Sequence, residues 1–198
     1  HSWGAWQGNL LVEGFFTDLS DVFALTEIGI ENGILVKERR NESGARVGGF
    51  NLEGKIAYED HWQLQAGLTW HRSLYKEAHS WADDVEATRK MFRTPDLYGY
   101  FVTSCSPVKP LTLSLSGTYT GRMLVEHNSG YIEQNRTEKT PGFFDLNFKI
   151  AYDFKLYRHI NLQLNAGVQN FLNAWQKDFD QGPDRDSGYM YGPASPRC

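Results

Sequence analysis

One stretch of sequence, LTLSLSGTYTGRM at residues 111–123, alternates between apolar or small residues and hydroxyl or basic residues. The odd positions hold Leu111, Leu113, Leu115, Gly117, Tyr119, Gly121 and Met123, and the even positions hold only Thr, Ser and Arg. A helix would mix these two sets on one face, whereas a strand points them to opposite sides. The stretch is therefore predicted to be a β-strand with one apolar and one polar face.

The same alternation recurs along the chain. Aromatic and aliphatic residues alternate with charged ones from Phe144 to Phe154, and aliphatic residues alternate with Asn and Gln from Ile160 to Val168. The alternation is looser from Leu10 to Ala24, where it runs on through Val22. Period-two patterning of this kind predicts an all-β protein. We expect an antiparallel up-and-down meander of about seven strands, near residues 8–28, 44–58, 62–74, 97–106, 111–124, 143–155 and 160–172.

The predicted connections alternate in length. Short links are expected at residues 59–60, 106–110 and 157–159, and long polar ones at residues 32–44, 75–95, 125–141 and 173–188. Successive turns of a meander lie at opposite ends of the sheet, so one end would carry tight turns and the other long loops. Outer-membrane β-barrels have this asymmetry, with short periplasmic turns and long extracellular loops.

Two interpretations of the two-faced strands compete. In a membrane barrel the strands need roughly 9–11 residues, with an outward apolar band, aromatic girdles and a polar interior. Tyr58 and Trp62 beside one short turn, and Phe154 and Tyr157 beside another, fit such girdles. In a soluble sandwich or barrel the same aromatics would belong to the core. The residues alone leave a secreted, carbohydrate-binding β-protein open as the alternative.

Composition excludes several classes of protein. No uninterrupted apolar run approaches the length of a membrane helix. A net charge of −4 without a basic block argues against a nucleic-acid partner. The two cysteines, Cys105 and Cys198, form neither a disulfide framework nor a metal-ligand spacing. The scattered histidines and the absence of a nucleophile or phosphate-loop motif predict that the chain is not an enzyme, and no cofactor or metal is predicted.

An ordered series of short motifs resembles the later barrel strands of TonB-dependent outer-membrane receptors. The series consists of NLLVEGFFTD at residues 9–18, GGFNLEG at 48–54, RTPD at 93–96, TYTG at 118–121, AGVQNFLNA at 166–174 and YGPASPR at 191–197. In that family the sixth motif leads into the final strand. The spacing between residues 41 and 53 is shifted from the family's pattern. The resemblance covers nearly the whole chain.

The resemblance implies that residues 1–198 are a partial, C-terminal region of a receptor barrel, located in the bacterial outer membrane, with the plug domain and final strand absent. Receptors of this kind have roughly 22 strands around a plugged lumen, so about seven strands cannot close the barrel. The parent protein would bind a scarce nutrient of the ferric siderophore, haem or cobalamin type. It would import that nutrient with energy relayed by TonB, and its partners would be membrane lipid, the nutrient and the TonB complex. A passive porin or an adhesin would permit the same strands.

The ligand-binding residues are unknown from the sequence, and only weak loop candidates can be named. The loop after residue 173 carries carboxylates at alternating spacing, which could suit Ca²⁺ but lacks the full EF-hand order and its glycine. A solvated loop turned by Gly182 and Pro183 is the simpler interpretation. The loop after residue 75 adds a histidine and a tryptophan that could touch a ligand or cap a short helix. The candidates are His79, Trp81, Asp178, Asp180, Asp184 and Asp186.

Overall fold

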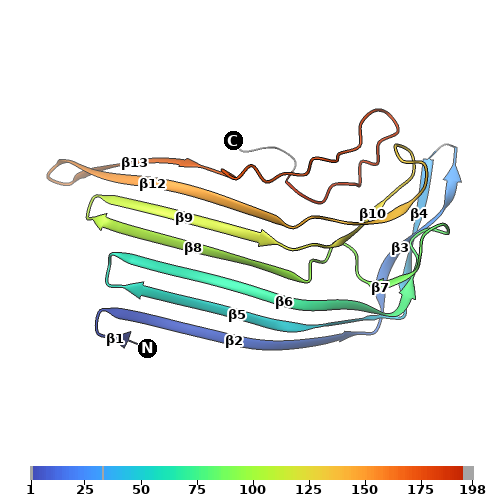
Figure 1. The fold of residues 1–198 in the computed structure, drawn as a ribbon, viewed down its shortest axis with the longest axis horizontal. Helices are drawn as coiled ribbons and strands as arrows, with labels where there is room; N and C mark the ends of the chain where they lie inside the picture. The colour runs from blue at the N-terminus through green and yellow to red at the C-terminus, as the bar shows by residue number, and fades with distance from the viewer. Residues whose placement is uncertain (1, 33, 194–198) are drawn as a thin grey trace.

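The computed structural model describes residues 2–32 and 34–193. Its main element is one antiparallel sheet, in the order β1-β2-β5-β6-β8-β9-β12-β13 (Figure 1). The strands are β1 (Ser2–Trp3), β2 (Trp6–Leu19), β5 (Ala45–Tyr58), β6 (Trp62–His79), β8 (Leu97–Val108), β9 (Leu111–Thr120), β12 (Phe143–Tyr157) and β13 (Ile160–Val168). The short β7 (Thr88–Lys90) pairs with β6. No helix in the described ranges has the length and apolarity to cross a membrane.

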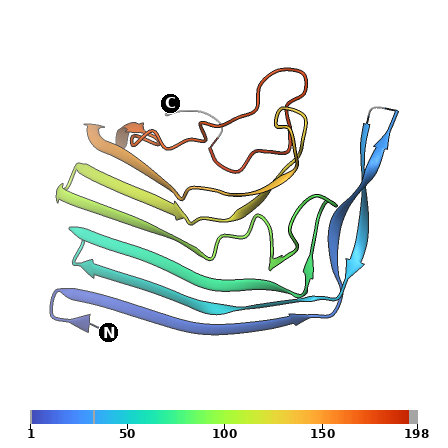
Figure 2. The same cartoon turned by 45° about the vertical axis from the view of Figure 1, so that its right-hand side comes forward.

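The predicted meander is confirmed. Seven long strands pair with their neighbours in chain order, and the sheet does not close on itself (Figures 1 and 2). The short connections all lie at one end of the sheet, and the long connections all lie at the other end. This arrangement is the asymmetry that the sequence predicts for a barrel wall. Cys198 and most of the motif at residues 191–197 lie outside the described residues.

The prediction of one strand over residues 8–28 is wrong. β2 ends at Leu19, and a separate strand β3 (Val22–Glu31) begins after Ser20 and Asp21. It pairs with β4 (Ile34–Glu42), so the expected polar loop at residues 32–44 is mostly a strand. The β3–β4 hairpin stands at the loop end and rises away from the sheet (Figure 2). Asp18, Ser20 and Asp21 interrupt the apolar alternation, which resumes at Val22, so the loose pattern over residues 10–24 covers two strands rather than one.

Smaller differences in the strand ends have a related cause. Strand pairing continues into some of the predicted loops and stops early in some of the predicted strands. β6 runs to His79 instead of residue 74, whereas β9 ends at Thr120 and β13 at Val168. The predicted loop at residues 125–141 contains a second hairpin, made of β10 (Leu124–His127) and β11 (Arg136–Lys139).

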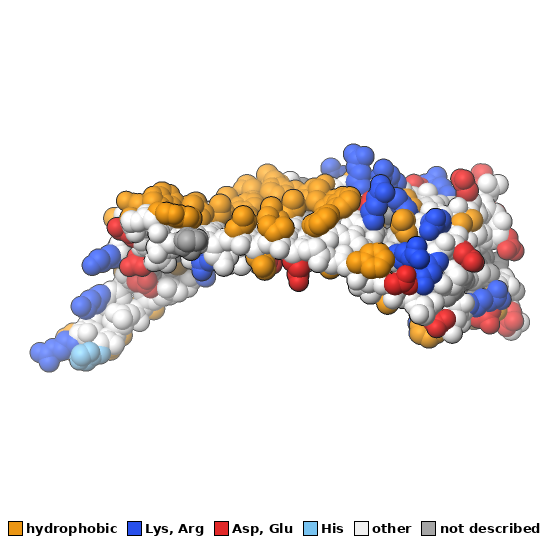
Figure 3. Space-filling model, turned by 90° about the horizontal axis from the view of Figure 1, so that it is seen from below, with side chains coloured by type: hydrophobic (Ala, Val, Ile, Leu, Met, Phe, Trp, Pro, Cys, Tyr) orange, Lys and Arg blue, Asp and Glu red, His pale blue; other side chains and the backbone are white. Residues whose placement is uncertain are grey.

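The strand register places the alternating residues on two continuous faces. Leu115 lies opposite Phe148, and Leu113 lies opposite both Ile150 and Cys105. The apolar set therefore forms one face of the whole sheet, and its side chains gather there as a band (Figure 3). The other face carries Ser, Thr, Asn, Gln, Lys, Asp and Glu, because successive side chains of a strand point to opposite sides.

Aromatic residues mark both ends of the apolar band. At the short-turn end the Trp6 ring lies 4.8 Å from Tyr58 and 6.1 Å from Trp62, measured between ring centroids. Towards the loop end Phe50 and Trp70 are stacked, with centroids 6.3 Å apart. These clusters are arranged as interfacial girdles are in membrane barrels.

The sheet itself has no protein core. Large apolar residues along it are exposed, for example Leu10 (71%), Val12 (64%) and Phe16 (70%). The buried apolar residues of the described chain instead lie at the loop end: Ala45, Tyr75, Trp81, Ala82, Val125 and Tyr189. A single open sheet with one apolar face needs another apolar medium to cover it. The packed part of the molecule is its loop end.

Candidate functional site

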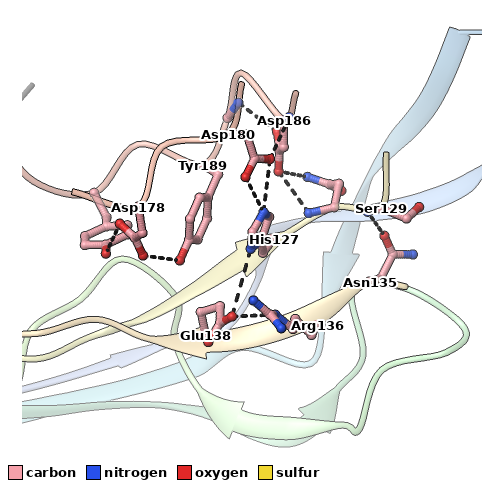
Figure 4. A network of polar contacts seen from close by, with 12 residues as sticks. His127, Ser129, Asn135, Arg136, Glu138, Asp178, Asp180, Asp186 and Tyr189 are labelled. Carbon is pink, nitrogen blue, oxygen red and sulfur yellow. Dashed lines mark hydrogen bonds and ion pairs between the residues drawn. The ribbon is translucent and has the colours of Figure 1, made fainter. Parts of the chain in front are cut away.

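The loop end contains a compact unit that we call the loop layer: residues 80–87, the β10–β11 hairpin and residues 170–193. The unit packs around side chains that are almost completely buried, among them Trp81, Val125 and Gln176. Short strands and turns, rather than long regular elements, carry the polar side chains of this unit, among them His127, Asp180 and Tyr189 (Figure 4). A surface that would otherwise be a set of independent loops is thereby held in one shape.

His127 is the centre of the loop layer. It ends β10 and is 3% exposed, and its Nε2 atom lies 3.0 Å from both carboxylate oxygens of Asp180. The Asp180 side chain is itself only 2% exposed. On the other side of the ring, Nδ1 lies 4.0 Å from Oε1 of Glu138, which is ion-paired with Arg136. Nδ1 makes no hydrogen bond within the described structure.

Two carboxylates fix the backbone around this histidine. The backbone N–H of Asp186 donates to Oδ2 of Asp180 at 2.9 Å. The Asp186 carboxylate in turn accepts hydrogen bonds from the backbone and side-chain N–H groups of Asn128, at 2.9 and 2.7 Å, and from the backbone of Gly188. Burial raises the pKa of Asp186, but these hydrogen bonds outweigh it and hold the pKa below its usual 3.8.

Asp178 anchors two tyrosines. The hydroxyl of Tyr189 donates to one of its oxygens at 3.0 Å, and the hydroxyl of Tyr191 donates to the other at 2.5 Å. Burial raises the pKa of Asp178, but the bonds from Tyr191 and Tyr189 lower it more, so the pKa lies below 3.8. Burial and the adjacent carboxylate raise the pKa of both tyrosines above 10. The hydroxyls therefore remain donors throughout the neutral range.

Gln176 and Trp81 are two buried side chains that hold segments of the loop layer together through hydrogen bonds. The Gln176 amide, 1% exposed, donates to the carbonyl of Tyr189 and accepts from the backbone N–H of Tyr191. Trp81, also 1% exposed, donates its indole N–H to Thr137 of β11 at 3.1 Å. The Lys37 ammonium lies 5.5 Å from the centre of the Trp81 ring, which connects the β3–β4 hairpin to the same unit.

The structure brings together most of the residues that the sequence singled out. Asp178, Asp180 and Asp186 belong to one hydrogen-bonded network, and Trp81 packs beneath the same hairpin. Asp184 is exposed, and only its backbone carbonyl approaches the hairpin, at Gly130. His79 ends β6, and its ring lies edge-on to Tyr75, 5.9 Å away. No short helix forms after it.

Sequence reasoning missed His127, Tyr189 and Gln176, which hold the network together. His127 lies 53 residues from Asp180, and Tyr189 and Gln176 bond to residues of their own loop without any periodicity, so the strand pattern did not identify them. Among residues 2–32 and 34–193, no three His, Cys, Asp or Glu side chains are grouped to hold a metal ion. Three of the four carboxylates, Asp178, Asp180 and Asp186, accept hydrogen bonds from protein groups, whereas Asp184 is exposed. This arrangement stabilises the shape of the loop layer.

Comparison with known proteins identifies the family to which this architecture belongs. The family described as TonB dependent receptor-like, beta-barrel matches residues 2–171. The chain belongs to this family of TonB-dependent receptors. The family consists of receptors and transporters rather than enzymes, and its members lie in the bacterial outer membrane. No curated protein matches the chain.

Two solved structures have the receptor fold of this chain. The ferric-catecholate import receptor Fiu from E. coli K12, in its closed form, superposes with a TM-score of 0.57 at 20% identity, over 95% of this chain and 24% of its own. The copper transporter OprC superposes with a TM-score of 0.60 at 16% identity, over 100% of this chain and 28% of its own. The chain thus spans about a quarter of each of these receptors.

Proposed function

We propose that this chain forms part of the wall and of the ligand-facing surface of a receptor that imports a scarce nutrient, with energy relayed by TonB. The nutrient class is that of a ferric siderophore, haem or cobalamin. The plug, the final strand and the contact with TonB belong to parts of the receptor beyond residues 1–198. No chemistry on the nutrient is required, because binding and a wet path through the barrel suffice.

The packed loop layer is the observation that carries this proposal. Loops that only connect strands have no reason to bury a histidine, a tryptophan and a glutamine to 3% or less. Ordering a loop before the ligand arrives lowers the entropy that binding must overcome. A pre-formed layer at the long-loop end suits a receptor that must capture a dilute solute. A passive pore has no such need.

The sequence-predicted residues then divide into two roles. Trp81 and Asp180 are buried and would act by shaping the loop layer. Exposed side chains carried by that layer would contact the nutrient directly. Asp184 is one of them, and Tyr131 (55% exposed) and Met190 (51%) offer apolar contact elsewhere on the layer. Fiu and OprC are named for metal-containing cargo, which is compatible with the ferric siderophore class.

Membership of the receptor family disfavours the soluble alternative. A secreted carbohydrate-binding protein would need its apolar band covered by protein, but the described sheet is a single layer with that band exposed. The passive porin or adhesin differs from the proposed receptor in energy coupling, and that difference can be measured.

The test uses cells that express the complete receptor, with and without an intact TonB complex. Binding and uptake of radiolabelled ferric siderophore, haem and cobalamin are measured separately. We expect one class to bind in both strains and to accumulate only when TonB is present. Accumulation that does not depend on TonB would indicate a passive pore, and absence of binding to all three classes would refute the proposed cargo.

A matched pair of variants connects the cargo to the loop layer. His127→Ala removes the centre of the loop layer, and His159→Ala changes a histidine beside the short turn at the opposite end of the sheet. We expect only the first to weaken nutrient binding while the receptor still assembles in the membrane. Equal binding by the two variants would show that the loop layer does not form the binding surface.

A further inference from the structure

The apolar face of the sheet is not flat. A recess of about 380 Å³ lies in its middle, between β2, β5, β6, β8, β9 and β12. Its floor is formed by small residues: Gly54 lies opposite Ala66 on the neighbouring strand, and Gly99 of β8 also lines the recess. Phe101, which covers Gly117 and stacks on Phe144, forms one wall. The other wall consists of leucines at positions 10, 52 and 68.

The recess continues towards the short-turn end. A second depression of about 640 Å³ shares Leu10, Gly54 and Ala66 with the first and extends to Ile56 and Leu64. The two together form an apolar furrow along the sheet. The recess in the middle of the sheet is lined by leucine, aromatic and small residues and is complementary to a flexible hydrocarbon chain, whereas the second depression also includes Asn9 and Lys55 at its margin.

A cationic group lies on the same face, at the loop end of the furrow. Arg72 follows Trp70 by two residues and lies opposite Gly48, so it belongs to the apolar face. Its side chain is exposed, and no described residue forms an ion pair with it. Lys and Arg side chains border the apolar band at this end in Figure 3.

The neighbours of Arg72 leave a positive excess. Arg46 lies two residues before Gly48, the strand partner of Arg72, and its side chain is 3.0 Å from the Asp18 carboxylate. The Lys76 ammonium lies 2.5 Å from the same carboxylate. The single Asp18 carboxylate therefore pairs with both Arg46 and Lys76, and Arg72 adds a third positive charge to this group. A guanidinium at the edge of an apolar band is suited to a phosphate, which it can bind through two parallel hydrogen bonds.

The distance between Arg72 and the furrow matches the distance between the phosphate and the acyl chain of one lipid molecule. Arg72 and Leu68 are four residues apart on one strand face, which corresponds to about 13 Å at the usual rise of a strand. We infer that this wall binds a phosphorylated membrane lipid of the leaflet on the loop side, with its phosphate at Arg72 and one acyl chain in the furrow. This inference requires the outer-membrane location but not the identity of the nutrient.

Two glycines on the apolar face, one inside and one outside the furrow, provide a matched pair of test variants. A Cβ at Gly54 would meet only Leu10 and the Asn9 carbonyl, at 3.8 and 3.9 Å, so Gly54→Leu fits the backbone and fills the furrow. Gly14 also lies on the apolar face, and its Cβ would meet only the Phe50 ring at 3.5 Å, outside the recess. Gly14→Leu therefore adds the same side chain without occupying the furrow.

The probe is phosphatidylglycerol with a photoreactive diazirine on one acyl chain, added in trace amount to phosphatidylcholine vesicles that contain the complete receptor. Crosslinked peptides are identified by mass spectrometry. We expect labelling to concentrate on peptides that contain residues 52–54, 66–68 and 99–101. Gly54→Leu should abolish this concentration, and Gly14→Leu should not. Ala66→Val provides a smaller filling change should Gly54→Leu fail to assemble.

The phosphate is tested separately with the diacylglycerol analogue of the probe, which carries the same diazirine chain but has no phosphate and no charge. Arg72→Gln should lower furrow labelling by the anionic probe about fivefold relative to the neutral one, as expected for one basic residue at a lipid surface. Lys149→Gln, a change on the polar face and outside the furrow, should leave the ratio unchanged. Labelling spread evenly along the apolar band, or a ratio insensitive to Arg72→Gln, would overturn the inference and leave only unselective boundary lipid.

Discussion

The ring of Tyr189 lies flat on the imidazole of His127, with ring centroids 3.6 Å apart and planes inclined by 7°. This contact joins the end of β10 to the segment that follows β13. The hydroxyl of the tyrosine and Nε2 of the histidine are each bonded to a different aspartate, Asp178 and Asp180. The stacked pair therefore connects the carboxylates of Asp178 and Asp180 to the β10–β11 hairpin.

Removing the histidine should loosen the loop layer without unfolding the sheet. His127→Ala leaves the buried Asp180 carboxylate with the Asp186 backbone N–H as its remaining donor, and loss of a hydrogen bond to a buried charged group costs about 1.5–3 kcal/mol. We expect faster hydrogen exchange in residues 124–139 and 170–191 and unchanged exchange in β8 and β9. Tyr131→Ala, at an exposed position of the same hairpin, is the control. Unchanged exchange in His127→Ala would show that the layer is held by other contacts.

The loop layer should also loosen in acid. Asp178 and Asp186 have pKa values below 3.8 in the folded state, so their stabilisation is complete above that value and is lost as the pH falls through the folded-state pKa values. Both tyrosine pKa values are raised above 10, so their contribution is lost only when the pH exceeds 10. Limited proteolysis of the loop layer should therefore be constant at neutral pH and rise below about pH 4.

Asp178→Asn separates the two carboxylates in that experiment. The variant retains an acceptor for one tyrosine but does not titrate, so its remaining acid sensitivity should come from Asp186. If the wild type and the variant have identical proteolysis profiles against pH, Asp178 does not contribute to the transition.

The sequence predicted the sheet because its two faces are chemically different at every strand. From Leu111 to Thr120 and from Phe144 to Phe154, a shift of one residue would place charges in the apolar band, so the pattern determines the register. The β3–β4 hairpin was not predicted because the apolar alternation resumes at Val22 after only a short polar interruption at Ser20 and Asp21. A signal was present, since Asn32-Gly33 is a preferred hairpin turn and Asn32 has a φ of 53°.

The loop layer could be predicted only in part. The spacing of Asp178, Asp180, Asp184 and Asp186 drew attention to the correct segment, but it indicated solvent or Ca²⁺ as the partners. Their actual partners, such as His127 and Asn128, lie far away in the chain. Contacts of this kind depend on how the loops pack, which no repeat or motif encodes.

A glycine on the polar face limits what can be placed between β5 and β6. A Cβ at Gly49 would lie 2.2 Å from the Trp70 carbonyl oxygen and 2.5 Å from Cβ of His71, and neither backbone can yield easily. Gly49→Ala should therefore destabilise the receptor by roughly 1–3 kcal/mol, as overpacking does. Gly54→Ala, which has room, should not. The melting temperatures of the two variants in detergent test this, and equal values would contradict it.

The two faces of the sheet should respond very differently to charge. Leu115 lies on the apolar face and Ser114 on the polar face of the same strand, next to each other in sequence. In the complete receptor, Leu115→Arg should cost roughly 2–4 kcal/mol if the position is near the bilayer midplane, and Ser114→Arg should cost much less because lumen charges stay hydrated. The fraction of each variant that folds into lipid vesicles measures the difference.

Stability alone does not identify the medium that covers the apolar face, because an arginine buried in a protein core would be costly too. Labelling of single cysteines does identify it. Cysteines at positions 113, 115 and 148, on the apolar face by register, should react with a reagent confined to the lipid phase. Cysteines at positions 114 and 147, on the polar face, should react with a small aqueous reagent. If the first three were shielded from both reagents in the native membrane, protein rather than lipid would cover the band, and this sheet would not be the outer wall of the receptor.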